Sequence, residues 1–173
     1  MINKNKNEMF DWFKAIFIAV FIAFFLHTFV FATSIVEGES MEPTLEDGER
    51  LIFNKFVYMI DEPERGDIII IQQTDKNYVK RIIALPGETI EIRNSNLYID
   101  GTRYEETFLD KEDAIHTGNF GPIFIPEEKY FVMGDNREIS KDSRNGLGYI
   151  QRDEIIGKSE IIIFPFSEWE RTK

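Results

Sequence analysis

Hydrophobic residues form one long segment near the start of the chain. Residues 12–32 are apolar except for Lys14, His27 and Thr28. As a helix, these 21 residues would reach roughly 31 Å, because each residue adds about 1.5 Å. That length is enough to cross the hydrocarbon core of a bilayer. We therefore predict a transmembrane anchor over residues 12–32, preceded by a short cytoplasmic N-terminus over residues 1–11.

A second interpretation of this segment is a secretory signal that is cut at the small residues Ala32–Ser34. The apolar core of such a signal usually has about 7 to 15 residues, so the greater length here favours a retained anchor. Lys4 and Lys6 precede the segment and Lys14 lies near its edge. The positive-inside rule therefore predicts that the remainder of the chain is exported in both cases. A buried core helix is disfavoured, because no other segment has the amphipathic helical pattern to pack around it.

Beyond residue 35, short apolar runs alternate with turn signals, a pattern typical of an antiparallel β domain. Asp100–Gly101 is a strong signal for a two-residue hairpin. Gly66, Pro86–Gly87 and Gly121–Pro122 indicate further turns. The predicted strands are rich in β-branched and aromatic residues and comprise Arg50–Tyr58, Asp67–Gln73, Asn77–Leu85, Glu88–Arg93, Asn96–Asp100, Lys129–Gly134 and Lys158–Phe164.

One long stretch interrupts this pattern. Thr102–Gly121 is polar and acidic and has no clear periodicity, so it predicts an excursion between strands. Together with the hairpin before it, the excursion would form a small β cap inserted at about residues 86–126. Residues 35–85 and 127–166 remain for the main β domain. The predicted fold class is mainly β: one N-terminal transmembrane helix, an antiparallel β domain and a smaller inserted β cap.

Composition limits the possible partners. The 173 residues carry a net charge of −11, and the acidic excess lies beyond residue 34. A nucleic-acid surface would need the opposite sign, so we expect no nucleic-acid partner. The chain has no cysteine and two histidines, which excludes disulfides and supports no zinc site. We expect neither a metal nor another cofactor.

The stretch "GESMEPTL", Gly38–Leu45, places Ser40 in a turn shortly after the apolar segment. A nucleophilic serine needs a base, but His27 lies in the apolar segment and His116 in the acidic excursion. A serine, histidine and aspartate triad is therefore not supported. A neutral lysine can take this role if its pKa falls from about 10.4 to about 7 or 8, mainly through burial.

The stretch "YVKRIIALPGE", Tyr78–Glu88, offers such a lysine. Strand alternation places Lys80 on the same face as Tyr78 and Ile82 and points Arg81 the other way, toward solvent. The alternative is that Lys80 and Arg81 are ordinary charges on an edge strand, and Ser40 a common turn residue. The pattern alone leaves both interpretations open.

The stretch "GDNREISKDSRNG", Gly134–Gly146, follows an apolar strand and is dense in Asp, Asn, Ser and Arg. It can be a solvated loop whose side chains bind their own backbone. It can also supply a hydroxyl that orients a lysine and an Asp–Arg pair that braces a site. Composition does not choose between the two.

The order of these segments resembles bacterial type I signal peptidase, in the short single-anchor form typical of Gram-positive bacteria. The resemblance rests on "GESMEPTL", "RGDIIII", "YVKRIIALPGE" and "GDNREISKDSRNGLGYI" and extends from the anchor to about Phe166. By position, it implies that Ser40 is the acylating nucleophile and Lys80 the general base. It also implies that the main β domain is catalytic.

The same resemblance assigns supporting roles in loop Gly134–Gly146. Ser140 would match the hydroxyl that orients the lysine, and Asp142 and Arg144 would match the bracing ion pair. Family members are β-rich and metal-free, with a catalytic sheet domain and a smaller inserted one.

Around the nucleophile, Met41 would lie beside the substrate cleft and the backbone N–H of Ser40 would supply one oxyanion donor. In the double-span branch of the family, a serine two places before the nucleophile supplies a second donor. Gly38 occupies that place in this chain. We expect a backbone group or a water molecule to replace that serine.

The implied activity is that of a membrane-bound serine endopeptidase, which removes signal peptides from exported preproteins through an acyl-enzyme. Specificity would come from shallow apolar pockets that accept small residues. The implied location is the cell membrane, with a single span, a cytoplasmic N-terminus and an extracytoplasmic catalytic domain. The expected partners are preproteins and the lipid bilayer, on which Phe56–Ile60 would rest unless they form a core strand; no obligate protein partner is expected.

Two alternatives remain. A membrane-tethered β domain could bind export partners and use Ser40 and Lys80 only structurally. A Ser-Lys protease of related fold could act on another substrate, such as a self-cleaving regulator, but that class is soluble and the anchor disfavours it.

Overall fold

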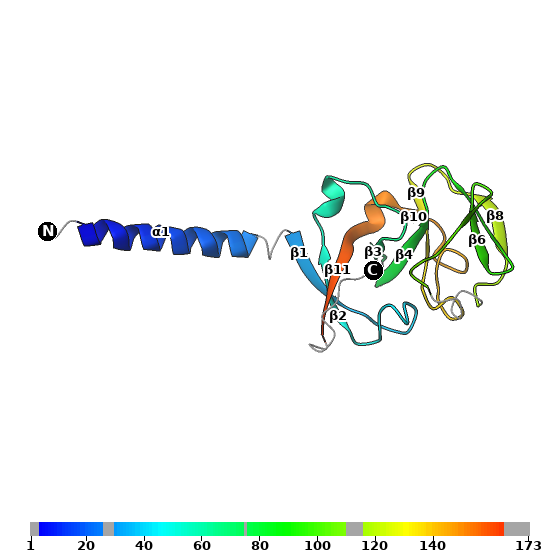
Figure 1. Ribbon diagram of the computed structural model, residues 1–173, viewed down its shortest axis with the longest axis horizontal. Helices are drawn as coiled ribbons and strands as arrows, with labels where there is room; N and C mark the ends of the chain where they lie inside the picture. Colours follow the sequence, from blue (N-terminus) through cyan, green and yellow to red (C-terminus); the bar gives the residue numbers. More distant parts are fainter. Residues whose placement is uncertain (1–3, 26–29, 75, 110–115, 165–173) are drawn as a thin grey trace.

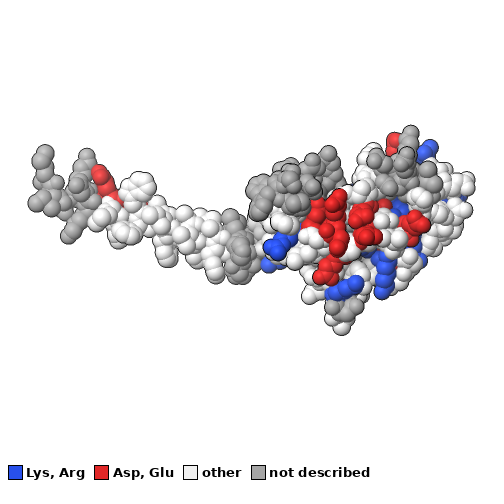
Figure 2. All heavy atoms as spheres, turned by 90° about the horizontal axis from the view of Figure 1, so that it is seen from below, with Lys and Arg blue, Asp and Glu red and all other residues white. Residues whose placement is uncertain are grey.

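The computed structural model describes residues 4–25, 30–74, 76–109 and 116–164. The helix α1 (Lys4–Phe25) extends away from two β-sheets (Figure 1). Its apolar side chains from Met9 to Phe25 are exposed, and Trp12 and Phe17 are the most exposed of them. Figure 2 shows that the surface along α1 is largely uncharged, whereas Asp and Glu gather on the displayed face of the sheets.

The predicted anchor, residues 12–32, is not confirmed. Within the described part of the chain, no helix combines the length and the apolarity needed to cross a membrane. Residues 26–29, including His27, lie outside the described residues. Phe31 and Ala32 belong to a strand rather than to a helix, because they pair with Asn54 and Phe53.

The larger sheet has seven antiparallel strands in the order β1-β2-β11-β3-β4-β9-β10. β1 is an edge strand, and β4 lies in the interior between β3 and β9. The strands are β1 (Phe31–Ile35), β2 (Arg50–Asn54), β3 (Ile68–Gln72), β4 (Asn77–Ala84), β9 (Lys129–Met133), β10 (Ile150–Gln151) and β11 (Ile155–Phe164).

The smaller sheet has four antiparallel strands in the order β7-β6-β5-β8; β6 and β8 are labelled in Figure 1. Its strands follow β4 and precede β9 in the chain: β5 (Thr89–Arg93), β6 (Asn96–Ile99), β7 (Thr102–Tyr104) and β8 (Phe120–Phe124). One buried cluster joins the two sheets, because Ile83 and Phe131 of the larger sheet pack with Ile90 and Ile92 of the smaller one. The predicted domain limits at residues 86 and 126 stay a prediction.

The fold is mainly antiparallel β, and each predicted strand overlaps an observed one. The predicted hairpin is confirmed, because Ile99 pairs with Thr102 across Asp100 and Gly101. Both turn residues have positive φ, 50° and 75°, as this hairpin type requires. The strands β1, β7, β8 and β10 were not predicted; β1 begins in the predicted anchor, and β7 and the start of β8 lie in the predicted excursion.

Two local predictions are wrong. The strand predicted over Arg50–Tyr58 ends at Asn54, whose side-chain oxygen accepts from the backbone N–H of Phe56 and Val57. A 3-10 helix, η2 (Val57–Met59), follows. It buries Tyr58 and leaves Phe56, Met59 and Ile60 exposed. A second 3-10 helix, η3 (Arg152–Glu154), precedes β11.

The predicted turn at Gly121–Pro122 lies inside β8. A proline lacks the N–H for a ladder hydrogen bond, and an edge strand tolerates this on its free side. β8 is such a strand, and its register with β5 shifts between Ile90 and Ile92. This irregularity accommodates the two residues within the sheet.

Candidate active site

A buried lysine contacts the serine of the first loop. Lys80 lies on interior strand β4, where it pairs with Ile69 of β3. Ser40 lies between β1 and β2. Lys80 Nζ donates to Ser40 Oγ at 2.6 Å and to the carbonyl oxygen of Val79 at 2.8 Å. Lys80 is 2% exposed, so the interpretation of an ordinary edge-strand charge is wrong.

Burial changes the acidity of this lysine. Desolvation lowers the pKa of Lys80 from 10.5 to about 8, because a buried site disfavours the charged amine. The carboxylates of Asp142 and Asp135 oppose this shift of the pKa, and the ammonium of Lys76 adds to it. About a tenth of the amine is thus neutral at pH 7, and a general base requires this neutral form.

A cleft of about 370 Å³ opens beside Ser40 and Lys80. One wall comes from β1 and the residues after it, Thr33–Glu37, and the other from Lys76–Val79. Met41 also lines this cleft, although it is 1% exposed and packs in the core with Leu45; its place beside a bound substrate stays a prediction. The cleft therefore brings an edge strand beside Ser40 and Lys80.

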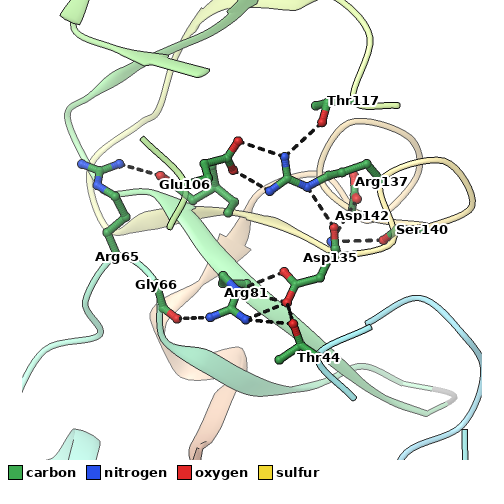
Figure 3. Close-up of polar contacts among 12 residues, drawn as sticks. Thr44, Arg65, Gly66, Arg81, Glu106, Thr117, Asp135, Arg137, Ser140 and Asp142 are labelled. Carbon is green, nitrogen blue, oxygen red and sulfur yellow. Dashed lines mark hydrogen bonds and ion pairs between the residues drawn. The ribbon is translucent and has the colours of Figure 1, made fainter. Parts of the chain in front are cut away.

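Arg81 is not directed to solvent, contrary to the prediction. It is 1% exposed. It donates to the Asp135 carboxylate from Nε at 2.9 Å and from Nη2 at 2.6 Å, and to Gly66 O at 2.9 Å (Figure 3). A buried guanidinium needs such partners, because an unpaired buried charge is costly. The role of Asp135 was not predicted; its signal in the sequence was its place two residues after the buried strand β9.

The loop of residues 134–146 closes over the serine. The backbone nitrogen of Gly134 donates to Ser140 Oγ at 3.1 Å and to Asp142 Oδ2 at 3.2 Å. A Cβ on Gly134 would lie 2.2 Å from Ser40 O and 2.3 Å from Ser140 Oγ. The N–H of Asn136 donates to Ser40 O at 3.2 Å. Only glycine permits this close approach. The role of Gly134 was not predicted from the sequence.

Ser140 and Asp142 are fully buried. Arg144 donates to both carboxylate oxygens of Asp142, at 2.9 and 2.8 Å, so the ion pair that the resemblance implied is present. Among the hydrogen bonds of the described residues, Ser140 Oγ contacts Gly134 rather than Lys80. Its orienting role toward Lys80 stays a prediction.

Gly38 has an exposed position and a φ of +85°. Its N–H donates to the Asp47 side chain at 2.7 Å. It supplies no side-chain donor, and the second oxyanion donor stays unassigned.

His116 is exposed and lies 3.8 Å from Glu138, whereas His27 lies outside the described residues. Across the described ranges, no group of His, Asp and Glu side chains could hold a metal ion.

Fold and site together define a class: β-rich proteins in which a buried lysine contacts a serine, the arrangement of Ser-Lys hydrolases. Residues 9–164 match the family described as "Signal peptidase, peptidase S26". The chain belongs to this family, within its bacterial type I signal peptidases, and is a serine hydrolase. The resemblance drawn from the sequence motifs is thereby confirmed.

Individual relatives cover nearly the whole chain. Signal peptidase I of Bacillus amyloliquefaciens is 49% identical over 99% of this chain and 94% of its own length. Signal peptidase I T of Bacillus subtilis (strain 168) is 49% identical, over 98% and 93%. Signal peptidase IB of Staphylococcus aureus is 36% identical, over 95% and 94%.

A solved structure shares the fold. The crystal structure of a signal peptidase I from Enterococcus faecalis V583 is 33% identical, with a TM-score of 0.50. The similarity covers 57% of this chain and 97% of that one. Membership of this family supports the removal of signal peptides as the function of the chain.

Proposed function

We propose that the protein is a membrane-bound serine endopeptidase that removes signal peptides from exported preproteins, with Ser40 and Lys80 as its catalytic pair. One observation carries the proposal: a lysine that is 2% exposed lies with Nζ 2.6 Å from Ser40 Oγ. Burial holds the pKa of this lysine at about 8. A neutral amine at that position can accept the hydroxyl proton.

Catalysis proceeds in two steps. Ser40 Oγ attacks the scissile carbonyl while Lys80 takes its proton, and the tetrahedral oxyanion forms near the Ser40 N–H. Lys80 then gives the proton to the leaving amine, which leaves an ester on Ser40. In the second step, Lys80 takes a proton from water, and the resulting hydroxide attacks the ester. Ser40 regains a proton, and the signal peptide leaves with a free carboxylate.

The substrate binds in the cleft of about 370 Å³ beside this pair. β1 is an edge strand, and β4 pairs with β9 only from Arg81 onward. An extended preprotein segment can therefore add its backbone along the cleft walls. The limited volume favours small side chains next to the cut.

We also propose that residues 12–32 contain a retained membrane anchor, with the catalytic domain outside the cell. The exposed apolar side chains along α1 support contact with lipid. Cleavage at Ala32–Ser34 would split β1, whose residues pair with β2 along Phe31–Ile35. The expected result is that the protein stays in the membrane after alkaline extraction. External protease should digest the catalytic domain of intact protoplasts and spare the N-terminus.

The catalytic proposal is tested with the full chain in detergent and a purified preprotein. Ser40→Ala and Lys80→Arg should both abolish cleavage, because Lys80→Arg keeps a cation but supplies no neutral base. The matched control is Lys141→Arg, at an exposed position one residue from Ser140, which should cleave normally. Normal processing by a folded Ser40→Ala or Lys80→Arg variant would contradict the proposal and favour a binding domain.

A further inference from the structure

Arg137 joins the loop of residues 134–146 to the segment between β7 and β8. Its side chain is 1% exposed. Nη1 and Nη2 donate to the two carboxylate oxygens of Glu106 at 3.2 and 2.5 Å, and Nη1 also donates to Thr117 Oγ1 at 3.1 Å (Figure 3). Glu106 follows β7, and Thr117 precedes β8. Glu106, Thr117 and Arg137 are called the Arg137 clamp below.

The clamp reaches the residue that touches the serine. Arg137 Nε donates to Gly134 O at 3.1 Å. Gly134 is the glycine packed against Ser40 O and Ser140, and its N–H faces Ser140 and Asp142. A displacement of Arg137 would therefore shift Gly134, which packs against both Ser40 and Ser140.

The same segment contacts the other two arginines near the site. Arg144 Nη1 donates to Thr117 O at 3.3 Å and Nη2 donates to Arg137 O at 2.8 Å, while this guanidinium also holds Asp142. The ring of Phe108 lies 4.1 Å from the Arg81 guanidinium carbon. The acidic excursion thus packs against the loop that carries Ser140 and against the neighbour of Lys80.

Burial distinguishes this ion pair from a surface pair. The Glu106 side chain is 8% exposed, so its two-oxygen contact with Arg137 is shielded from water and fixed in geometry. Removal of the Glu106 charge would leave a buried guanidinium without its counter-ion, which the loop can relieve only by rearrangement. The adjacent Glu105 is exposed, and surface charges of that kind contribute little.

We propose that the Arg137 clamp is a set of positioning residues, by which the excursion of the small sheet holds loop 134–146 against Ser40 and Lys80. The inference rests on the proposed peptidase function. None of the three residues is among the described residues that line the cleft beside Ser40. The clamp therefore acts on the rate of the chemical step and leaves substrate binding unchanged.

The experiment measures kcat and KM for preprotein cleavage by Glu106→Gln, together with the melting temperature. We expect kcat to fall about 10- to 100-fold, because misplacement of about 1 Å can cost about 100-fold, and KM to change less than about twofold. Two controls separate positioning from stability. Glu105→Gln changes an exposed neighbour. Glu88→Gln weakens another ion pair, Arg65–Glu88 at 2.5 Å with side chains 15% and 20% exposed.

Both controls should keep kcat within about twofold, even if Glu88→Gln lowers the melting temperature as much as Glu106→Gln does. Equal kcat losses in Glu88→Gln and Glu106→Gln would overturn the proposal, as would a folded Glu106→Gln with unchanged kcat. Should Glu106→Gln fail to fold, Thr117→Val decides. This substitution removes the hydroxyl that accepts from Arg137 and keeps a side chain of similar shape. We expect kcat to fall about two- to fivefold, and an unchanged kcat would overturn the proposal. If the unaltered chain does not cleave preprotein, the proposed function fails rather than the clamp.

Discussion

The two faces of β4 hold two cations in opposite ways. Lys80 and Arg81 are consecutive and 2% and 1% exposed. Arg81 makes a two-atom contact with the Asp135 carboxylate, whereas Lys80 donates to two neutral oxygens, Ser40 Oγ and Val79 O. A paired guanidinium keeps its charge. A lysine among neutral oxygens gives up its proton more readily.

One strand thus carries both a structural cation, Arg81, and, under the proposed function, a reactive one, Lys80. Lysine suits the reactive face because its pKa moves easily on burial, while arginine remains charged. The pKa of Lys80 is lowered to about 8. At about 1.4 kcal/mol per pKa unit, the folded protein destabilises the charged form of this lysine by about 3 kcal/mol relative to water. Reactivity here therefore has a cost in stability.

The largest expected effect on activity comes from removal of Lys80, the proposed base. Lys80→Met should lower the rate of preprotein cleavage by at least about 1000-fold, because no base remains for Ser40. Its melting temperature at pH 7 should not fall, since the methionine removes a buried charge. If the Lys80→Met variant still cleaved preprotein, or were much less stable than the unaltered chain, the contrast between Lys80 and Arg81 would be wrong.

Removal of Asp135, the counter-ion of Arg81, should act mainly on stability. Asp135→Asn leaves the Arg81 guanidinium without its counter-ion, so the free energy of unfolding should fall by about 3 to 5 kcal/mol. Urea denaturation of the detergent-solubilised protein measures this. Glu91→Gln, which weakens an exposed contact with Arg93 at 3.2 Å, is the control and should change it by less than about 0.5 kcal/mol. Similar losses in the two variants would contradict the contrast.

The pH dependence tests the state of Lys80. Because the neutral amine is the active form, kcat/KM should rise about tenfold per pH unit below about 8 and level off above it. The sign for stability follows from the same lowered pKa of Lys80. Between pH 8 and 10.5 the unfolded chain keeps the proton that the folded chain has lost, so stability from this group rises with pH. A flat kcat/KM between pH 6 and 9 would be inconsistent with Lys80 as base.

The smallest effect should come from the hydroxyl next to the Arg81 pair. Thr44 Oγ1 donates to Asp135 Oδ2 at 2.6 Å. Thr44→Val removes this bond and keeps the shape, so the free energy of unfolding should fall by about 1 kcal/mol, and kcat should stay within about twofold. A fall in kcat of much more than about twofold would instead indicate that Thr44 takes part in the reaction.

Much of the fold was predictable because it depends on local patterns. Runs rich in β-branched and aromatic residues marked β2 to β6, β9 and β11, and Asp100–Gly101 marked its hairpin through the backbone preferences of two residues. The predictions failed where neighbours decide. Asn54 ends β2 through its side-chain hydrogen bonds, and Gly121–Pro122 enters a strand because that strand lies at a sheet edge.

The sequence by itself determined the candidates: Ser40, the lysine of a β-rich stretch, the Asp–Arg loop and their order, since these depend on residue type and spacing. Only the tertiary structure decided that β4 is interior, that Lys80 reaches Ser40 at 2.6 Å and that Arg81 turns to Asp135 instead of solvent. It also revealed Gly134 and the Arg137 clamp. The physical reason is that burial, pKa and ion pairing depend on atoms from strands and loops far apart in the chain.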